Sequence, residues 1–262
     1  MSETTQEVAA RARSYAEVCG EYTSPYEREK LVADWAHKEH QAQGVLADFR
    51  KRVGDPAGAE MLEIGFGSGV HVATFAAAGA RMRALEVNEV LLGLAQGLLR
   101  ERGLIATLSV YDGVSVPYPD NSFDYIYSIS VLEHASNPAK LLQEVARVLR
   151  PGGLCYIAFP NRWSLRETHT GFLFVGYLPR AAAKAALRFL GSNAINELNL
   201  HFLSFFSLQR MCRRAGLRIR MEREASTRPR RFLKTTLAAV GVHYSAILKT
   251  VMVVLEKPTS SL

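Results

Sequence analysis

The middle of the chain, from about residue 57 to residue 160, alternates short apolar runs with stretches in which apolar residues recur every three or four positions. The short runs predict β-strands and the longer stretches predict helices. The expected strands are Glu60–Ile64, Arg81–Glu86, Ala106–Val110, Phe123–Ile129 and Leu154–Phe159; the expected helices are Val70–Ala78, about Glu89–Arg100, and one opened by Asn137–Pro138 whose apolar face runs from Leu141 to Leu149. This alternation predicts an α/β fold with a parallel, doubly wound sheet.

The region before this core, residues 1–56, predicts an N-terminal helical cap. Ser24, Pro25 and Glu27 form a helix-start signal, in which Ser is the cap, Pro takes the first helical position and Glu lies three residues after the cap. No repeat or long linker divides the chain. We therefore expect residues 1–262 to form a single domain, with residues 57–160 as its ligand-binding core.

The region after the core has two parts. Residues 161–206 are rich in aromatic residues and predict a helical insertion that covers a substrate bearing a ring or an aliphatic chain, although a flap that only packs on the sheet fits equally well. Residues 207–262 predict a helix capped by Ser207 and ended by Gly216. Apolar and charged residues then alternate from Leu217 to Glu222, which is typical of a half-buried strand.

The composition is that of a globular protein. Of 262 residues, 48% are hydrophobic and 22% charged, which excludes a disordered or fibrous chain. The three Cys residues include no close pair, which excludes a disulfide framework and a zinc knuckle. The first ten residues lack the pattern of a secretion signal, and no run of about 18 apolar residues predicts a membrane span. We expect a cytoplasmic protein.

The net charge of +7 is concentrated in one stretch. Between Arg210 and Lys234 the chain has nine Arg, one Lys and two Glu. Such a stretch is typical of contact with nucleic acid, an anionic membrane or an acidic substrate, but also of a solvated face. Part of it falls on the strand after Leu217, where exposed charges discourage edge-to-edge pairing. The charge alone does not identify a partner.

The chemistry of the core lies where its strands end. The first strand runs into a glycine-rich turn with the pattern Glu-x-Gly-x-Gly-x-Gly, from Glu63 to Gly69. Val70 breaks the dinucleotide-binding pattern, and no Gly-Lys-Ser/Thr follows, so a triphosphate loop is excluded. Glu86 ends the second strand and can accept ribose hydroxyls, and Asp112 ends the third and can accept from an adenine amino group. These groups suit a nucleoside with an amino-acid tail.

Five motifs between Met61 and Pro160 together resemble the class I S-adenosylmethionine-dependent methyltransferases, in particular the type 11-like subgroup that modifies small molecules. They are LEIGFGSG, the acidic end of ALEVN, YDG, PYPDNSFDYIYSISVLEH and LLQEVARVLRPGG. The resemblance implies S-adenosylmethionine as cofactor and a Rossmann-like, seven-stranded sheet whose sixth strand lies at the edge and whose last strand, Lys249–Leu255, is antiparallel. It implies that the cofactor is held by Glu63, Gly65, Phe66, Gly67, Gly69, Glu86, Val87, Asp112, Gly113, Ser128 and Ile129.

Two histidines are candidates for the base that takes a proton from an oxygen acceptor. His134 follows the fourth strand, and His169 follows the fifth. Each also has a plain structural interpretation, as a packing residue at a helix start or a surface-loop residue. The ubiquinone-type O-methyltransferases, which this region resembles, can bind a divalent metal through Glu-x-x-Glu-His. Here Ser130 replaces the first Glu, two of three ligands remain, and we predict no metal.

The acceptor is expected to be a small or lipid-like molecule, methylated most readily at oxygen. The Asn/Asp-Pro-Pro-Tyr/Phe motif of base-amino methylation is absent, and Cys155 follows Leu154 rather than the Pro of a pyrimidine C5 nucleophile. Arg228, Arg230, Arg231 and Lys234 suggest an anionic acceptor or partner. Two alternatives stay open: an RNA or DNA methyltransferase that uses residues 210–234, and a non-catalytic cofactor-binding partner protein. The oligomeric state cannot be inferred.

Overall fold

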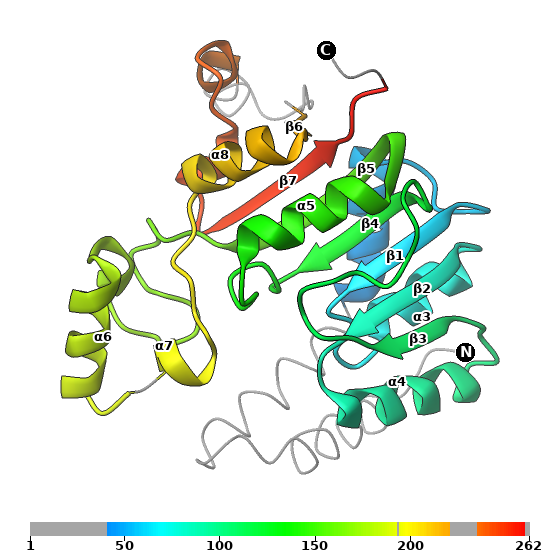
Figure 1. Ribbon diagram of the computed structural model, residues 1–262, viewed down its shortest axis with the longest axis horizontal. Coiled ribbons are helices and arrows are strands. Elements are labelled where there is room, and N and C mark those ends of the chain that lie inside the picture. The colour runs from blue at the N-terminus through cyan, green and yellow to red at the C-terminus, as the bar shows by residue number, and fades with distance from the viewer. Residues whose placement is uncertain (1–40, 193, 221–234, 260–262) are drawn as a thin grey trace. The chain divides into compact units, whose positions relative to one another are not determined.

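The computed structural model describes residues 41–192, 194–220 and 235–259. In this part of the chain, seven strands form one mixed sheet in the order β3-β2-β1-β4-β5-β7-β6 (Figure 1). The strands are β1 (Glu60–Ile64), β2 (Arg81–Glu86), β3 (Thr107–Val110), β4 (Phe123–Ile129), β5 (Leu149–Pro160), β6 (Arg218–Ile219) and β7 (Thr250–Glu256). The helices are α3 (Val70–Ala77), α4 (Glu89–Glu101), α5 (Pro138–Val148), α6 (Arg180–Phe189), α7 (Ala194–Glu197) and α8 (Phe205–Ala215), with 3₁₀ turns η1 (Val175–Tyr177) and η2 (Tyr244–Ile247).

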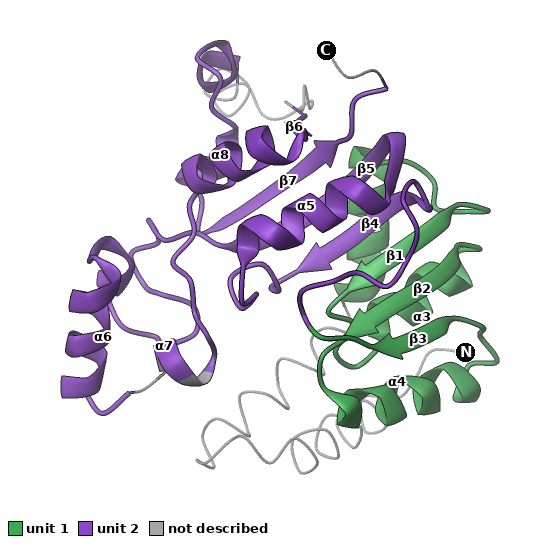
Figure 2. Ribbon diagram, viewed as in Figure 1, with its two compact units in different colours: residues 1–112 green, residues 113–262 purple. Residues whose placement is uncertain are grey.

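The chain divides into two compact units, residues 1–112 and residues 113–262 (Figure 2). In unit 1, β1 pairs in parallel with β2, and β2 pairs in parallel with β3. Met61, Leu62 and Ile64 of β1 are all fully buried, as in a parallel strand covered on both faces. A helix at residues 41–52 belongs to this unit, and its Phe49 packs edge-on against Phe75 of α3 with ring centroids 4.9 Å apart.

In unit 2, β4 pairs in parallel with β5, and β7 runs antiparallel to both of its neighbours, β5 and β6. Leu142, Val145 and Val148 of α5 are buried because they lie on its apolar face. The insertion after β5 contains η1, α6 and α7. A small core of its own is formed by Val175, Ala183, Leu187 and Ile195. The predicted fold class is therefore confirmed, including the antiparallel last strand, the edge position of β6 and the helical insertion.

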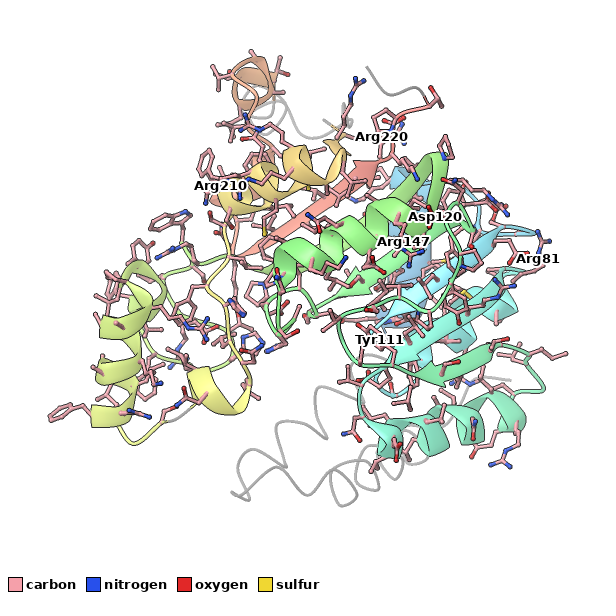
Figure 3. The ribbon with its side chains drawn as sticks, in the orientation of Figure 1. Arg81, Tyr111, Asp120, Arg147, Arg210 and Arg220 are labelled. Atoms are coloured by element: carbon pink, nitrogen blue, oxygen red, sulfur yellow. The ribbon has the colours of Figure 1, made fainter. Side chains whose placement is uncertain are left out.

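A partly buried ion pair between Glu144 and Arg147 connects the segment before β4 to helix α5. Glu144 accepts hydrogen bonds from the Val116 N–H at 3.0 Å and from the Arg147 guanidinium at 2.8 Å. Arg147 also donates to the Tyr118 carbonyl at 2.7 Å and to Asp120 at 2.9 Å (Figure 3). The Arg147 hydrogen bonds lower the pKa of Glu144 further than burial raises it, and the Val116 N–H adds to the lowering. The carboxylate is thus stabilised in its charged form.

Two predicted boundaries are wrong. The fifth strand begins at Leu149 rather than Leu154, and α5 ends at Val148, because Pro151 cannot continue a helix and restricts the residue before it to extended conformations. Leu149 is already extended and pairs with Phe123. Helix α8 is capped by Ser204 rather than Ser207. Ser204 accepts from the Ser207 N–H, and the Ser207 hydroxyl accepts from the Ser204 N–H, which forms a capping box.

Several predicted features lie outside the described residues: the helix start at Ser24–Glu27, and Arg228, Arg230, Arg231 and Lys234 of the basic stretch. The described part of that stretch is a solvated face. Its arginines are all exposed: Arg210, Arg213 and Arg214 on α8, Arg218 in β6 and Arg220 just after it. Figure 3 labels Arg210 and Arg220. Among the described residues, no helix combines the length and the apolar character needed to cross a membrane.

Candidate functional site

The glycine-rich turn of unit 1 connects β1 to α3. Gly65, Gly67 and Gly69 have φ angles of 78°, 52° and 80°, in the left-handed region that glycine adopts without strain. The Gly65 N–H donates to the Leu85 carbonyl at 2.8 Å, which binds the turn to β2. A Cβ atom on Gly69 would lie 2.7 Å from the Cβ of Ala95 in α4. The turn therefore presents bare backbone, and at Gly69 a side chain has no room.

Glu86 joins this turn to the end of β2. Its carboxylate accepts from the Gly67 N–H at 3.0 Å through Oε2 and from the Val87 N–H at 2.8 Å through Oε1. A carboxylate has about four lone-pair positions, so Glu86 keeps acceptor capacity for ligand hydroxyls. The adjacent Val87 side chain is 58% exposed, which leaves it available to pack against a ring.

The other two acidic candidates of unit 1 differ in exposure. Glu63 is buried on β1, with Oε1 3.7 Å from Nδ1 of His71. Asp112 follows β3 and is exposed. Burial, followed by the negative charges of Glu86 and Asp112, raises the pKa of the Tyr111 hydroxyl to about 12. Tyr111 therefore stays protonated at neutral pH.

These residues fit S-adenosylmethionine. The turn offers backbone groups to an amino-acid tail, Glu86 offers acceptors to two ribose hydroxyls, and Asp112 offers an acceptor to an amino group. Residues 60–70 contain no Lys or Arg, which suits a ligand without phosphate. In unit 2, Gly113 has a φ of 74°, Ser128 is buried and Ile129 is partly buried at the end of β4. Their assignment to the cofactor stays a prediction.

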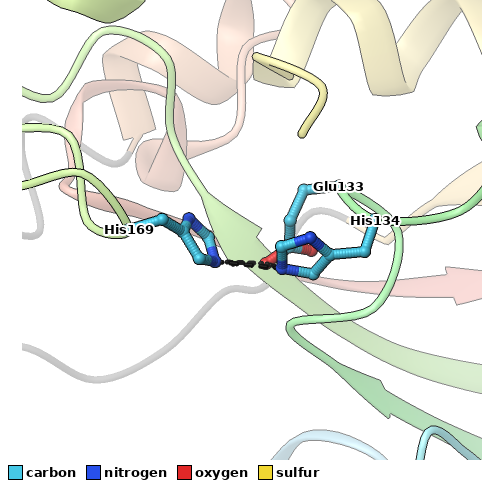
Figure 4. A group of neighbouring side chains, drawn as sticks. All are labelled: Glu133, His134 and His169. Atoms are coloured by element: carbon cyan, nitrogen blue, oxygen red, sulfur yellow. Dashed lines mark hydrogen bonds and ion pairs between the residues drawn. The ribbon is translucent and has the colours of Figure 1, made fainter. Parts of the chain in front are cut away.

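A second group of functional side chains lies in unit 2. We call it the histidine cluster; it consists of Glu133, His134 and His169 (Figure 4). Glu133 and His134 follow β4 in a turn in which the His134 N–H donates to the Val131 carbonyl at 2.9 Å. His169 comes from the insertion after β5. The Nε2 atoms of the two histidines lie 3.0 Å apart, with the rings edge to face.

The Nδ1 atoms of both histidines face hydrogen-bond acceptors, which determines that Nδ1 carries a proton. Nδ1 of His134 is 2.7 Å from the Leu198 carbonyl, which can only accept, so Nδ1 carries the proton. Nδ1 of His169 is 3.1 Å from Oε1 of Glu167. Burial raises the pKa of Glu167, but the bonds from His169 and from the Thr170 and His169 N–H groups outweigh it and lower the pKa to about 2. With both Nδ1 atoms facing acceptors, Nε2 is the nitrogen that each ring presents to the other.

Glu133 completes the cluster beneath the two rings. Its side chain is 1% exposed, and neither carboxylate oxygen has a hydrogen-bond partner among the described residues. Oε1 lies 3.9 Å from Nε2 of His134 and 3.8 Å from Nε2 of His169. Burial raises the pKa of Glu133 to about 7, against the lowering effect of His169. Burial also lowers the pKa of His134.

The structure brings together the two histidines that the sequence indicated separately. It also adds Glu167, which sequence reasoning missed, although the Glu-x-His spacing at residues 167–169 is a local signal that could have found it. The expectation of no metal rested on Glu133 and His134 as two of three ligands. His169 supplies a third potential ligand, so that reason no longer holds.

Comparison with known proteins supports the interpretation of the glycine turn and of the sheet. The model of a methyltransferase domain matches residues 62–157. Residues 62–157 belong to this methyltransferase domain family. The whole sheet has the fold of class I S-adenosylmethionine-dependent enzymes: a SAM-dependent methyltransferase from Aquifex aeolicus aligns with a TM-score of 0.53 at 20% identity, over 76% of this chain and 91% of that one.

Two relatives of the methyltransferase domain are named for demethylmenaquinone methylation and for ubiquinone biosynthesis. A demethylmenaquinone methyltransferase from Tropheryma whipplei is 31% identical over 141 residues, 53% of this chain and 56% of that protein. A ubiquinone biosynthesis O-methyltransferase from Aromatoleum aromaticum is 27% identical over 181 residues, 68% of this chain and 72% of that protein. The chain thus spans about half the length of the first of these relatives and more of the second.

Proposed function

We propose that this protein is an enzyme that transfers the methyl group of S-adenosylmethionine to an oxygen atom of a small, lipid-like acceptor. The methyltransferase domain and its fold support the reaction class. The relatives named for demethylmenaquinone methylation and ubiquinone biosynthesis support the acceptor class. The observation that carries the choice of oxygen is the pair of Nε2 atoms, 3.0 Å apart, in the histidine cluster.

The cofactor would be held by Glu63 and the turn from Gly65 to Gly69 at its amino-acid end, by Glu86 and Val87 at the ribose, and by Asp112 and Gly113 at the adenine. When bound, S-adenosylmethionine supplies a methyl group on a positively charged sulfur, which needs little further activation. The protein's task is then to hold an acceptor in line with that methyl group.

A hydroxyl acceptor must lose its proton as the new O–C bond forms. His134 and His169 present Nε2 atoms that can act on this proton, while the Leu198 carbonyl and the Glu167 carboxylate accept from their Nδ1–H groups. Both histidines follow the carboxyl ends of strands, where ligands of open α/β sheets bind. We therefore propose His134 and His169 as the catalytic residues for the acceptor.

A labelled-methyl assay against pooled quinols, phenols, sterols and RNA tests the function. We expect label in a small molecule, an O–CH3 signal in the product by NMR, and no label with Glu86→Ala. Label on nitrogen or carbon would contradict the choice of oxygen. Label in RNA alone would favour the nucleic-acid alternative. Tight cofactor binding with no turnover on any pool would favour the non-catalytic alternative.

Two finer proposals concern the surroundings of the site. Arg230 and Arg231, beyond the described residues, would contact an anionic acceptor, and an unchanged acceptor KM in their double substitution to Ala would exclude this. The protein would act in the cytoplasm, which cell fractionation tests.

A further inference from the structure

We propose that Glu133, His134 and His169 bind a divalent first-row transition-metal ion, and that this ion activates the acceptor hydroxyl. The second half of this proposal rests on the proposed function, whereas the binding site itself does not. Two imidazoles and one carboxylate suit ions such as Zn²⁺ better than Mg²⁺ or Ca²⁺, which prefer oxygen ligands.

The spacing of the three groups fits a common ion. Zn–N and Zn–O bonds are about 2.0–2.2 Å long, so neighbouring ligand atoms around one ion lie roughly 3 Å apart. The two Nε2 atoms are already at 3.0 Å. Oε1 of Glu133 lies 3.8 Å and 3.9 Å from them, so a small side-chain rotation brings it into place. All three ligand atoms lie within 4.8 Å of one another (Figure 4).

The outer contacts of the histidines are those of metal ligands. A histidine that binds a metal through one nitrogen donates its other N–H to a carboxylate or a backbone carbonyl, which fixes the tautomer and orients the ring. Nδ1 of His169 meets Glu167, and Nδ1 of His134 meets the Leu198 carbonyl. The two Nε2 atoms are thereby left on the sides of the rings that meet, 3.0 Å apart.

Without a cation this arrangement is unfavourable. Two Nε2 atoms lie 3.0 Å apart, on rings whose Nδ1 atoms face acceptors, beside a carboxylate that is 1% exposed and has no hydrogen-bond donor among the described residues. A buried polar group without a partner costs free energy. One proton on the histidine pair would satisfy the N···N contact but would leave the Glu133 oxygens without a short bond. A single divalent ion satisfies all three groups.

The site is reached from solvent, and three protein ligands leave coordination positions open. The His134 and His169 side chains are 29% and 18% exposed. Ser130, which replaces the first Glu of the ubiquinone-type motif, is itself exposed with a φ of 56°, and His169 from the insertion takes the third place. With the ion bound, His134 and His169 would act on the acceptor through the metal and not as free bases. An acceptor hydroxyl bound to the ion would release its proton to water, and the resulting oxyanion would form the O–C bond as the S–C bond breaks. No oxidant or reductant is needed.

The test uses the full-length protein after removal of metals with a chelator. Titration with Zn²⁺ should show one bound ion per chain by calorimetry and elemental analysis, and Co²⁺ should give the visible absorption of nitrogen coordination. His169→Ala and Glu133→Gln should each weaken Zn²⁺ binding on the order of 100-fold, and Glu167→Gln about 10-fold, because it only orients His169. Thr168→Ala, the exposed neighbour, should bind as wild type. Circular dichroism confirms that each variant is folded.

Binding of no ion by the wild-type protein, or wild-type affinity in His169→Ala, would overturn the proposal. The outcomes also separate it from the proposed function. Chelator-insensitive methylation of an oxygen acceptor by a metal-free protein would retain the function and overturn the metal site. Stoichiometric Zn²⁺ binding that depends on His169, without methylation of any acceptor, would retain the site as an ion-binding site and overturn both the function and the role of the ion in it.

Discussion

The glycine turn of unit 1 draws on residues 63–88, whereas the histidine cluster of unit 2 joins Glu133 and His134 to residues 167–169 and to Leu198. The turn is made of backbone conformation and one carboxylate, and its contacts link neighbouring strands. The cluster is made of side chains from the loop after β4 and from the insertion. Substitutions in the two regions should therefore have separate effects. Those in the glycine turn should weaken cofactor binding, and those in the histidine cluster should slow the reaction at the acceptor.

The largest expected effect is on turnover. Substituting Ala for both His134 and His169 should lower kcat about 10²- to 10⁴-fold, the usual contribution of proton transfer by a positioned side chain. The Kd for S-adenosylmethionine should stay within about twofold, because neither histidine belongs to the turn. Calorimetry and a labelled-methyl assay measure the two quantities. A large loss of cofactor affinity would break the proposed division between the two regions.

A change at Gly69 in the glycine turn should lower the stability of the folded protein. Gly69→Ala places a Cβ 2.7 Å from Ala95 at a φ of 80°, and the strain and the overlap together should lower the free energy of unfolding by about 3 kcal/mol. Urea denaturation measures this. Adding Ala95→Gly should restore the part that is due to overlap but not the part that is due to backbone strain. No recovery in the double variant would show that the contact with Ala95 is not the cause.

A change at Glu86 tests a carboxylate that has two proposed contacts, the cofactor ribose and the Gly67 N–H. Glu86→Gln should weaken S-adenosylmethionine binding roughly 30-fold, or about 2 kcal/mol, because an amide keeps only one acceptor oxygen for the ribose and the Gly67 N–H. Glu89→Gln, three residues later on α4, is the matched control and should bind normally. Affinity measured by calorimetry that is the same in Glu86→Gln and Glu89→Gln would remove Glu86 from the cofactor site.

The smallest expected effect concerns the ion pair between Glu144 and Arg147 in unit 2. The pKa of Glu144 is lowered in the folded protein from its ordinary value of 4.5, through the hydrogen bonds from Arg147. Since the folded state favours the ionised carboxylate, its contribution is fully present above pH 4.5 and is lost as the pH falls through the lower, folded value. We expect a loss of about 1–2 kcal/mol in urea denaturation at low pH.

Glu144→Gln should lose this stability at neutral pH and remove that part of the acid dependence. The same acid dependence in wild type and Glu144→Gln would assign it to other groups. Cofactor binding measured at neutral pH should be unaffected, because Glu144 lies far along the chain from the turn.

Much of the fold could be read from the sequence because its signals are local. The bounds of β1, β2 and β4 were predicted as they stand, and Asn88 and Asn137 cap α4 and α5. The errors arose where two local signals compete. Ser204 and Ser207 are both acceptable caps, and only the packing of Phe205 and Leu208 in the core selects the first.

The sequence by itself determined the β-α order, the glycine turn, Glu86 at the end of β2 and the residue types that suit S-adenosylmethionine, since strand alternation and turn conformation depend on a few neighbouring residues. Only the tertiary structure decided that His134 and His169 form a pair above a buried Glu133. Residues 35 positions apart come into contact when the insertion folds back on the loop after β4, and the geometry of that closure depends on packing and hydrogen bonds such as the one to Leu198. No short stretch of sequence encodes those contacts.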